Sequence, residues 1–157
     1  MKKRIFWLML AAVLLPVLPS VAQSESYVAL SGNAYITAAP ENVNDGQKAA
    51  FIDEYHCTLR NWNSAETVVS YYFRTETIGK MNIALQARGH SQIEVSLLGK
   101  KKKIKLDSDT LARVEVGKFK VKTPGYIKVD IRGVKIKKGE DFGNVAAVFV
   151  GGDVAPV

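Results

Sequence analysis

The sequence predicts an all-β protein, an antiparallel β-sandwich or jelly roll of roughly eight or nine strands. Apolar and polar residues alternate in short runs from residue 68 onward, which is the period of a strand with one buried face. Glycines and a Pro-Gly pair separate these runs, as turns between antiparallel strands require. No run in this region has the period of an amphipathic helix.

The first 22 residues have the features of a secretory signal peptide. Three basic residues follow the first methionine, and an uninterrupted apolar run of eleven residues comes next, too short to span a bilayer. Small residues then precede a cut between Ala22 and Gln23. We therefore predict that residues 1–22 are removed and that residues 23–157 form a single β-sandwich domain. The product is expected to be exported, periplasmic or extracellular, without a stable membrane anchor.

Net charge argues against a nucleic-acid-binding protein, and cysteine content excludes a disulfide-stabilised fold. The predicted leader contains three of the 22 basic residues, so the remaining chain has a net charge of +4 instead of +7. This charge is too small for the dense basic footprint of a nucleic-acid-binding protein, and no nucleic-acid partner is expected. Cys57 is the only cysteine, so no intramolecular disulfide can form and the core must hold by packing.

The clearest strand covers residues 68–74, where Val69, Tyr71 and Phe73 share one face and the residues between them point to the other. Residues 49–55 fit either a strand or a helical turn. The run at residues 145–150 is apolar on both faces, so we expect it in the centre of a sheet. The remaining expected strands lie near residues 35–37, 81–87, 93–97, 104–106, 114–116, 119–121 and 127–131.

The connections between these strands carry their own signals. Gly89 is expected to end one strand before the next begins. Residues 100–103 are all lysines and are expected to form a charged hairpin tip. At Gly117 the alternation slips by one residue, which predicts a bulge or tight turn. Residues 40–46 form a polar connection, and Pro124-Gly125 predicts another turn.

Three segments carry a family resemblance: GNAYIT at residues 32–37, VSYYFR at residues 69–74 with Gly79 after it, and PGY at residues 124–126 leading to FGNV at residues 142–145. Together they resemble the domain of unknown function 5077 family, which stands at the front of secreted bacterial proteins and is usually followed by a second domain. This chain stops where that companion domain would begin, so we expect a stand-alone copy or a fragment.

The strand plan is also similar to the galactose-binding-like jelly rolls of carbohydrate-binding modules. That similarity implies sugar binding by analogy. Trp62, with Asn61 beside it, lies in a polar segment, and an exposed indole ring there would stack on a sugar while amides bind its hydroxyls. The alternative is a Trp that closes one end of the core, with its indole N–H bonded to a loop carbonyl.

A second candidate set lies on predicted outer faces. Tyr72, Arg74, Arg88 and Asp130 all point away from the expected core and together would floor a polar groove. The alternative is a solvated sheet face with cross-strand charge pairs. The lysine tract at residues 100–103, with Lys105, would contact acidic polysaccharide or a phosphate-rich surface. The alternative is that it protects a hairpin tip from aggregation.

No motif favours catalysis. His56 and Cys57 are adjacent on the chain and project in opposite directions if extended, so they cannot form a dyad. Residues 53–54 and 140–141 are adjacent acidic pairs that cannot by themselves supply the separated carboxylates of a glycosidase. No cofactor is expected, apart from a weak candidate for structural calcium on residues 107–110, which an Asx turn explains as well.

The sequence thus predicts a secreted, non-catalytic binding module whose ligand is a carbohydrate. The alternative is a structural or assembly domain that packs on a companion domain or partner protein.

Overall fold

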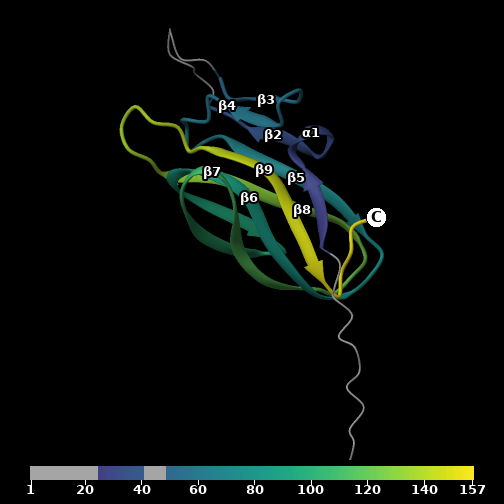
Figure 1. The fold of residues 1–157 in the computed structure, drawn as a ribbon. Helices are drawn as coiled ribbons and strands as arrows, with labels where there is room; N and C mark the ends of the chain where they lie inside the picture. Colours follow the sequence, from purple (N-terminus) through teal and green to yellow (C-terminus); the bar gives the residue numbers. More distant parts are fainter. Residues whose placement is uncertain (1–24, 41–48) are drawn as a thin grey trace, which may run out of the picture.

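The computed structural model describes residues 25–40 and 49–157, which form an antiparallel β-sandwich with a small hairpin at one end (Figure 1). The predicted leader and its cleavage site at Ala22 and Gln23 lie outside the described residues, as do residues 41–46 of the polar connection. The elements are β1 (Ser26–Ala29), α1 (Leu30–Asn33), β2 (Ala34–Ala38), β3 (Phe51–Asp53), β4 (Thr58–Arg60), β5 (Val68–Thr75), β6 (Gly79–Leu97), β7 (Lys100–Val121), β8 (Gly125–Lys135) and β9 (Asn144–Gly152).

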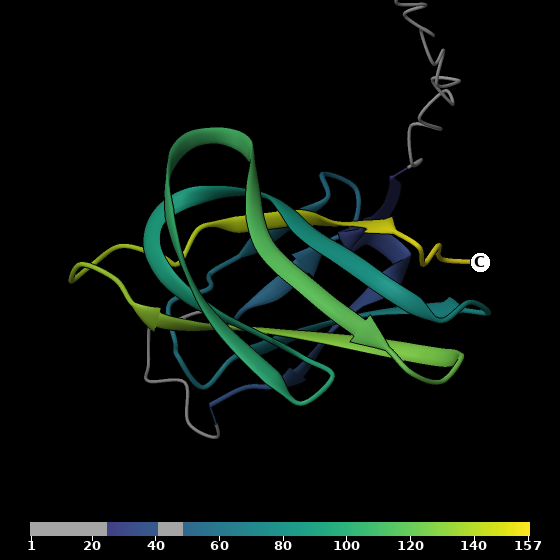
Figure 2. The same cartoon turned by 90° about the horizontal axis from the view of Figure 1, so that it is seen from below.

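The two layers share the long strand β6. Its first half pairs with β9 as far as Arg88, and its second half pairs with β8 from Gln92 onward. One layer continues from β9 to β1, and the other continues from β8 through β5 to β2. Strand β7 accompanies β6 along nearly its whole length, and the resulting hairpin curls from one layer to the other (Figure 2). The predicted fold class is confirmed.

The prediction that Gly89 ends a strand is wrong. Gly89 lies inside β6, where the strand exchanges β9 for β8 as its partner and its register with β7 shifts. Its φ of +140° is one that residues with a side chain rarely adopt. A glycine at this point lets one strand serve both layers, which alternation of apolar residues does not reveal.

The β6–β7 hairpin turns at Leu98 and Gly99, both of which have positive φ. Residues 100–103 lie within β7, so the prediction that these lysines form the tip is wrong. The bulge predicted at Gly117 is confirmed, because Ile83 pairs with Gly117 while Ala84 pairs with Glu115. Between these two pairs, β7 therefore contains one extra residue.

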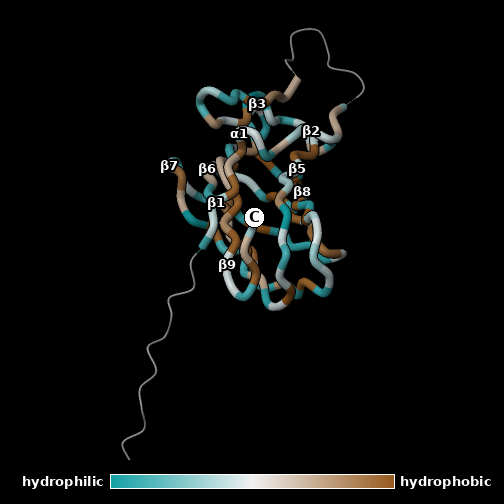
Figure 3. The backbone as a smooth tube through the Cα atoms, turned by 90° about the vertical axis from the view of Figure 1, so that its right-hand side faces the viewer, coloured by the Kyte–Doolittle hydropathy of each residue, from teal (hydrophilic) through white to brown (hydrophobic). Residues whose placement is uncertain are grey.

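The core lies between the two layers. Hydrophobic residues run along β9, which pairs with β1 on one side and β6 on the other, as predicted for a central strand (Figure 3). On β5, Val69, Tyr71 and Phe73 are buried, which confirms the predicted inward face. The Tyr71 hydroxyl donates a hydrogen bond of 2.6 Å to the Val145 carbonyl on the opposite layer. Burial raises the pKa of Tyr71, so this hydroxyl stays protonated as a donor.

The segment before β9 packs against both layers through Phe142. Its backbone N–H donates to the Trp62 carbonyl at 2.8 Å, and its carbonyl accepts from the Ser91 hydroxyl at 2.7 Å. Its ring lies so close to Gly133 that a Cβ atom there would be 2.2 Å from a ring carbon. Glycine at position 133 therefore provides the space for the buried ring.

We predict that Gly133→Ala lowers the free energy of unfolding by about 1 to 3 kcal/mol, because the added methyl group overpacks the Phe142 ring. Urea denaturation measures the change. The control is Gly151→Ala, since a Cβ atom at position 151 would meet its nearest neighbour, Glu25, at an ordinary 3.7 Å. Equal stability of the two variants would contradict the proposed packing constraint.

Candidate functional site

A pocket of about 400 Å³ opens where β6 bends. It is formed by β4 and the residue after it, the middle of β6 and β7, and the start of β9. Nine of its lining side chains carry hydrogen-bonding groups suited to a polar ligand: Thr58, Arg60, Asn61, Arg88, His90, Ser108, Asp109, Asp141 and Asn144. Four chain segments thus converge at one end of the sandwich.

Close backbone packing positions the start of β9 in this pocket. Gly143 has a φ of +101°, and a Cβ atom there would lie 2.1 Å from the Arg88 carbonyl oxygen. The buried Asn144 accepts a hydrogen bond of 2.9 Å from the Leu59 N–H through its side-chain oxygen, which ties β4 to β9. Asp141 accepts a hydrogen bond of 2.9 Å from the Gly143 N–H. The wall made by residues 141–144 is therefore held by contacts on several sides.

His90 is held between two carboxylates of β7. Its Nε2 lies 2.9 Å from Asp109 Oδ1, and its Nδ1 lies 3.1 Å from Asp107 Oδ1. Asp109 and Asp107 raise the pKa of His90 above its ordinary value of 6.5. Only the imidazolium form can donate from both nitrogens at once, so this geometry suits the protonated ring.

Arg88 lines the pocket without forming an ion pair among the described residues. Among residues 25–40 and 49–157, no carboxylate lies within 4.0 Å of its guanidinium group, and its side chain is exposed. Arg60 differs, because its Nη2 lies 3.5 Å from Asp53 Oδ2. The pKa of Asp53 is lowered, mainly by its hydrogen bond to His56. Arg88 thus presents unused donors to a ligand.

The structure separates the residues that were predicted to form one groove. Asn61 and Arg88 line the pocket at the bend of β6. Tyr72 and Arg74 lie on β5 and Asp130 lies on β8, on the outer face of the other layer. The prediction that Arg88 shares a groove with these three is wrong, because Arg88 precedes the bend and belongs to the layer that contains β9.

The outer face of β5 and β8 consists largely of paired polar groups. Asp130 accepts a hydrogen bond from the Ser70 hydroxyl and forms an ion pair of 3.0 Å with Lys128, whose pKa it raises. Arg74 pairs with Glu76 at 3.0 Å. Both ion pairs join residues two positions apart in the chain, so this face has the charge pairs of the alternative but not the cross-strand arrangement that it predicted. Tyr72 packs edge-on against Tyr35 of β2, with 6.0 Å between ring centroids.

Of the two interpretations of Trp62, the structure supports the core one. Its side chain is only 1% exposed, and its ring packs against Phe142 with 5.3 Å between centroids. The ring is therefore not available to stack on a sugar. The expected bond to a loop carbonyl is not formed, because the indole N–H has no hydrogen-bond partner among the described residues.

Sequence reasoning missed His90 as a site residue and considered Asp109 only as part of a calcium candidate. It placed residues 107–110 on a turn, whereas they lie inside β7 opposite the bend of β6. The carboxylates of Asp107 and Asp109 reach His90 only because β6 and β7 pair in this register. Within the described part of the chain, no cluster of His, Cys, Asp and Glu side chains is arranged to hold a metal ion. No helix among the same residues is long and apolar enough to cross a bilayer.

The fold is similar to that of solved carbohydrate-binding modules. The chain superposes on the family 35 carbohydrate-binding module of Cellvibrio japonicus Abf62 with a TM-score of 0.55 and 12% identity, covering 85% of this chain and 97% of the other. A family 35 module from Clostridium thermocellum gives 0.56 and 13%, covering 81% and 97%. A Podospora anserina GH26-CBM35 β-(1,4)-mannanase gives 0.58 and 9%, covering 85% of this chain but 28% of that enzyme. Such low identities show the fold alone.

The chain belongs to the family of the domain of unknown function DUF5077, which matches residues 28–155. This confirms the resemblance noted in the sequence. No curated protein matches the sequence.

We predict that His90 titrates above 6.5 in a proton NMR titration, with His56→Gln used to assign the two histidine signals. Because the folded-state pKa is raised, protonated His90 stabilises the fold fully below its unfolded pKa. That contribution disappears as the pH rises through the raised value. Asp109→Asn should lower the pKa of His90. A pKa at or below 6.5 in the unsubstituted protein would rule out the pairing.

We also predict that Trp62→Ala destabilises the domain by about 3 to 5 kcal/mol, because it empties a buried site next to Phe142. Trp62→Phe should cost much less, since it keeps the ring contact and removes an unpaired indole N–H. Thermal denaturation compares the two variants. An unchanged melting temperature for Trp62→Ala would mean that the ring is not part of the core.

Proposed function

We propose that this domain is an exported, non-catalytic module that binds a carbohydrate in the pocket at the bend of β6. The observation that carries the proposal is the concentration of hydrogen-bonding side chains from four segments around one pocket of about 400 Å³. This volume lies in the range of small-ligand sites, roughly 300 to 1,000 Å³. The composition of the first residues supports export.

The pocket offers donors and acceptors that complement sugar hydroxyls. Arg88 and Asn61 supply N–H donors, and Asp109 supplies a carboxylate acceptor. A hydroxyl group can donate and accept at once, so neighbouring hydroxyls of a sugar ring match such an alternation. The close backbone packing of Gly143 and the side-chain hydrogen bond of Asn144 fix the wall before a ligand arrives, which reduces the entropy lost on binding.

An exposed aromatic residue precedes strand β4, which lines the pocket, although it is not Trp62. Tyr55 is 91% exposed in the turn that joins β3 to β4, and β4 residues line the pocket. Its ring packs edge-on against His56, with 4.8 Å between centroids, which limits its orientation. We propose that this exposed ring, three residues before Thr58 of the lining, contacts the C–H face of a sugar that enters the site.

We predict that a glycan array with the purified protein shows binding to at least one sugar class. Arg88→Gln should weaken this binding roughly ten- to hundredfold, since a lost charge-assisted hydrogen bond is worth about 1.5 to 3 kcal/mol. Arg74→Gln is the matched control, because it makes the same change on the outer face of β5. Calorimetry with the best ligand measures both variants.

Three outcomes would contradict the proposal. Binding lost in Arg74→Gln but retained in Arg88→Gln would move the site to the outer face. Release of new reducing ends from the bound glycan would contradict a non-catalytic role, and Asp109 and Asp141, the two carboxylates that line the pocket, would be the residues to substitute next. If no glycan on the array binds, the result would favour the second candidate function.

That second candidate is a structural domain that packs on a companion domain or partner protein. The observation in its favour is the outer face of β2, β5 and β8, where Tyr35 is 58% and Tyr126 is 78% exposed. Exposed tyrosines are common in protein interfaces. Tyr35→Ser with Tyr126→Ser would abolish such packing and leave sugar binding unchanged.

A further inference from the structure

A second pocket, of about 510 Å³, adjoins the proposed site. It lies between the second half of β6, the facing part of β7 and the end of β8. His90 lines both pockets, so the two meet at this side chain. A ligand long enough to pass His90 would contact both pockets.

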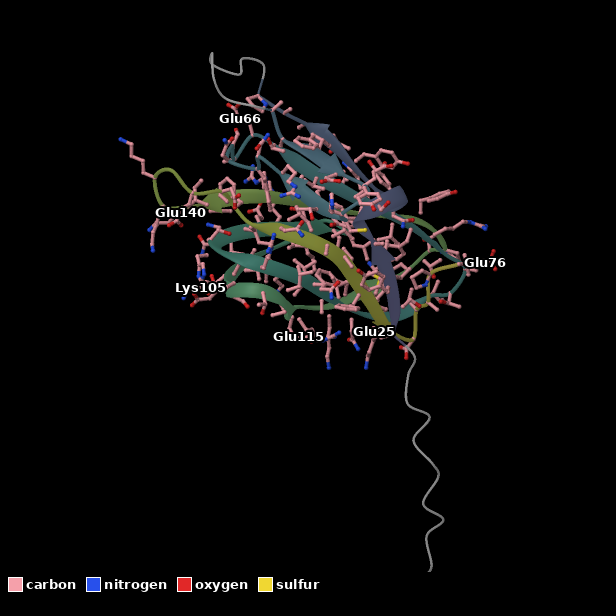
Figure 4. All side chains as sticks on the ribbon, turned by 45° about the horizontal axis from the view of Figure 1, so that its top comes forward. Glu25, Glu66, Glu76, Lys105, Glu115 and Glu140 are labelled. Carbon is pink, nitrogen blue, oxygen red and sulfur yellow. The ribbon has the colours of Figure 1, made fainter. Side chains whose placement is uncertain are left out.

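The second pocket is basic. Its lining includes Lys105, Lys135 and Lys137 but one carboxylate, Asp107. That carboxylate is already neutralised, because Asp107 Oδ2 lies 2.6 Å from Lys105 Nζ and Oδ1 lies 3.1 Å from His90 Nδ1. Lys105 and His90 lower the pKa of Asp107 accordingly. Figure 4 shows Lys105 at the outer side of the sandwich.

Lys135 and Lys137 have no such partner. In the described ranges, no carboxylate lies within 4.0 Å of either ammonium group, and both side chains are exposed. The strand register adds to the concentration of charge, because Gln92 pairs with Lys105 on one side and with Lys135 on the other. Paired residues on neighbouring strands share a face, about 5 Å apart between strands. Two lysines therefore flank one amide with no acid between them.

The rest of the lining suits an organic anion better than a free ion. Leu106 is buried and Ile136 is half-buried, so the pocket has an apolar wall as well as cationic donors. Gln92 adds a neutral amide that can donate to an oxyanion. A sugar ring with a carboxylate or sulfate group presents both kinds of surface at once.

We propose that this second pocket is an anion subsite and that the glycan is therefore acidic, with a carboxylate or sulfate group held by Lys135 and Lys137. This inference rests on the proposed function, since the first pocket would hold the neutral hydroxyls of the same glycan. Lys105 contributes less, because Asp107 already occupies its ammonium group.

The test compares three polymers of similar length by affinity electrophoresis and calorimetry: polygalacturonate, dextran sulfate and neutral dextran. We expect at least one acidic polymer to bind about tenfold more tightly than dextran at low salt, with the advantage shrinking as added salt screens the exposed lysines. Whichever acidic polymer binds identifies the anionic group as carboxylate or sulfate.

The variant is Lys135→Gln with Lys137→Gln, which should remove the preference for acidic polymer and leave neutral sugar binding unchanged. Its matched control is Lys118→Gln with Lys120→Gln, which makes the same charge change at two exposed lysines of β7. These lysines pair with the first half of β6, away from both pockets. An unchanged melting temperature shows that each variant is folded.

The outcomes separate this inference from the proposed function. Equal affinity for acidic and neutral polymers, or equal losses in the variant and its control, would overturn the anion subsite and leave sugar binding intact. Equally tight binding to polyadenylate would overturn the assignment to a glycan. Failure of every sugar, neutral or acidic, would overturn the proposed function itself.

Discussion

The structure depends on the packing of Phe142 and Gly143 against the bend of β6. The Phe142 ring fills the space above Gly133, and Gly143 lies against the Arg88 carbonyl at a distance that admits no side chain. Because β6 changes partners beside these contacts, the same few residues join the two layers and set where the strand turns. A Cβ atom at position 133 or 143 would push these segments apart, so small residues there are a steric requirement.

The candidate site forms as a consequence of this bend. Arg88 and His90 stand on either side of Gly89 and line the first pocket, and the register of the β6–β7 hairpin brings Asp107 and Asp109 to the His90 ring. The polar wall is therefore built from strands and their ends, whose backbone is held by ladder hydrogen bonds. Such a scaffold presents binding groups with little freedom to lose, which favours recognition of a weakly attractive ligand such as a sugar.

Charge is distributed unevenly over the surface. On the outer face of β5 and β8, Asp130 and Arg74 have partners of opposite charge, so that face is close to neutral. Around the two pockets, Arg88, Lys135 and Lys137 have no carboxylate within 4.0 Å among the described residues. These three cations place positive charge where a ligand in the two pockets can reach it, which connects the electrostatics to the proposed acidic glycan.

Local pattern in the sequence determined the all-β class, the inward face of β5, the bulge at Gly117 and the central position of β9, because alternation reports which side of a strand is buried. It could not determine that Gly89 bends one strand where two were expected, since a glycine marks a turn and a bend alike. It also could not decide between a buried and an exposed Trp62, or bring His90 to Asp109. Those outcomes depend on which strands pair and in what register, and only the tertiary structure decides that because the contacts join residues far apart in the chain.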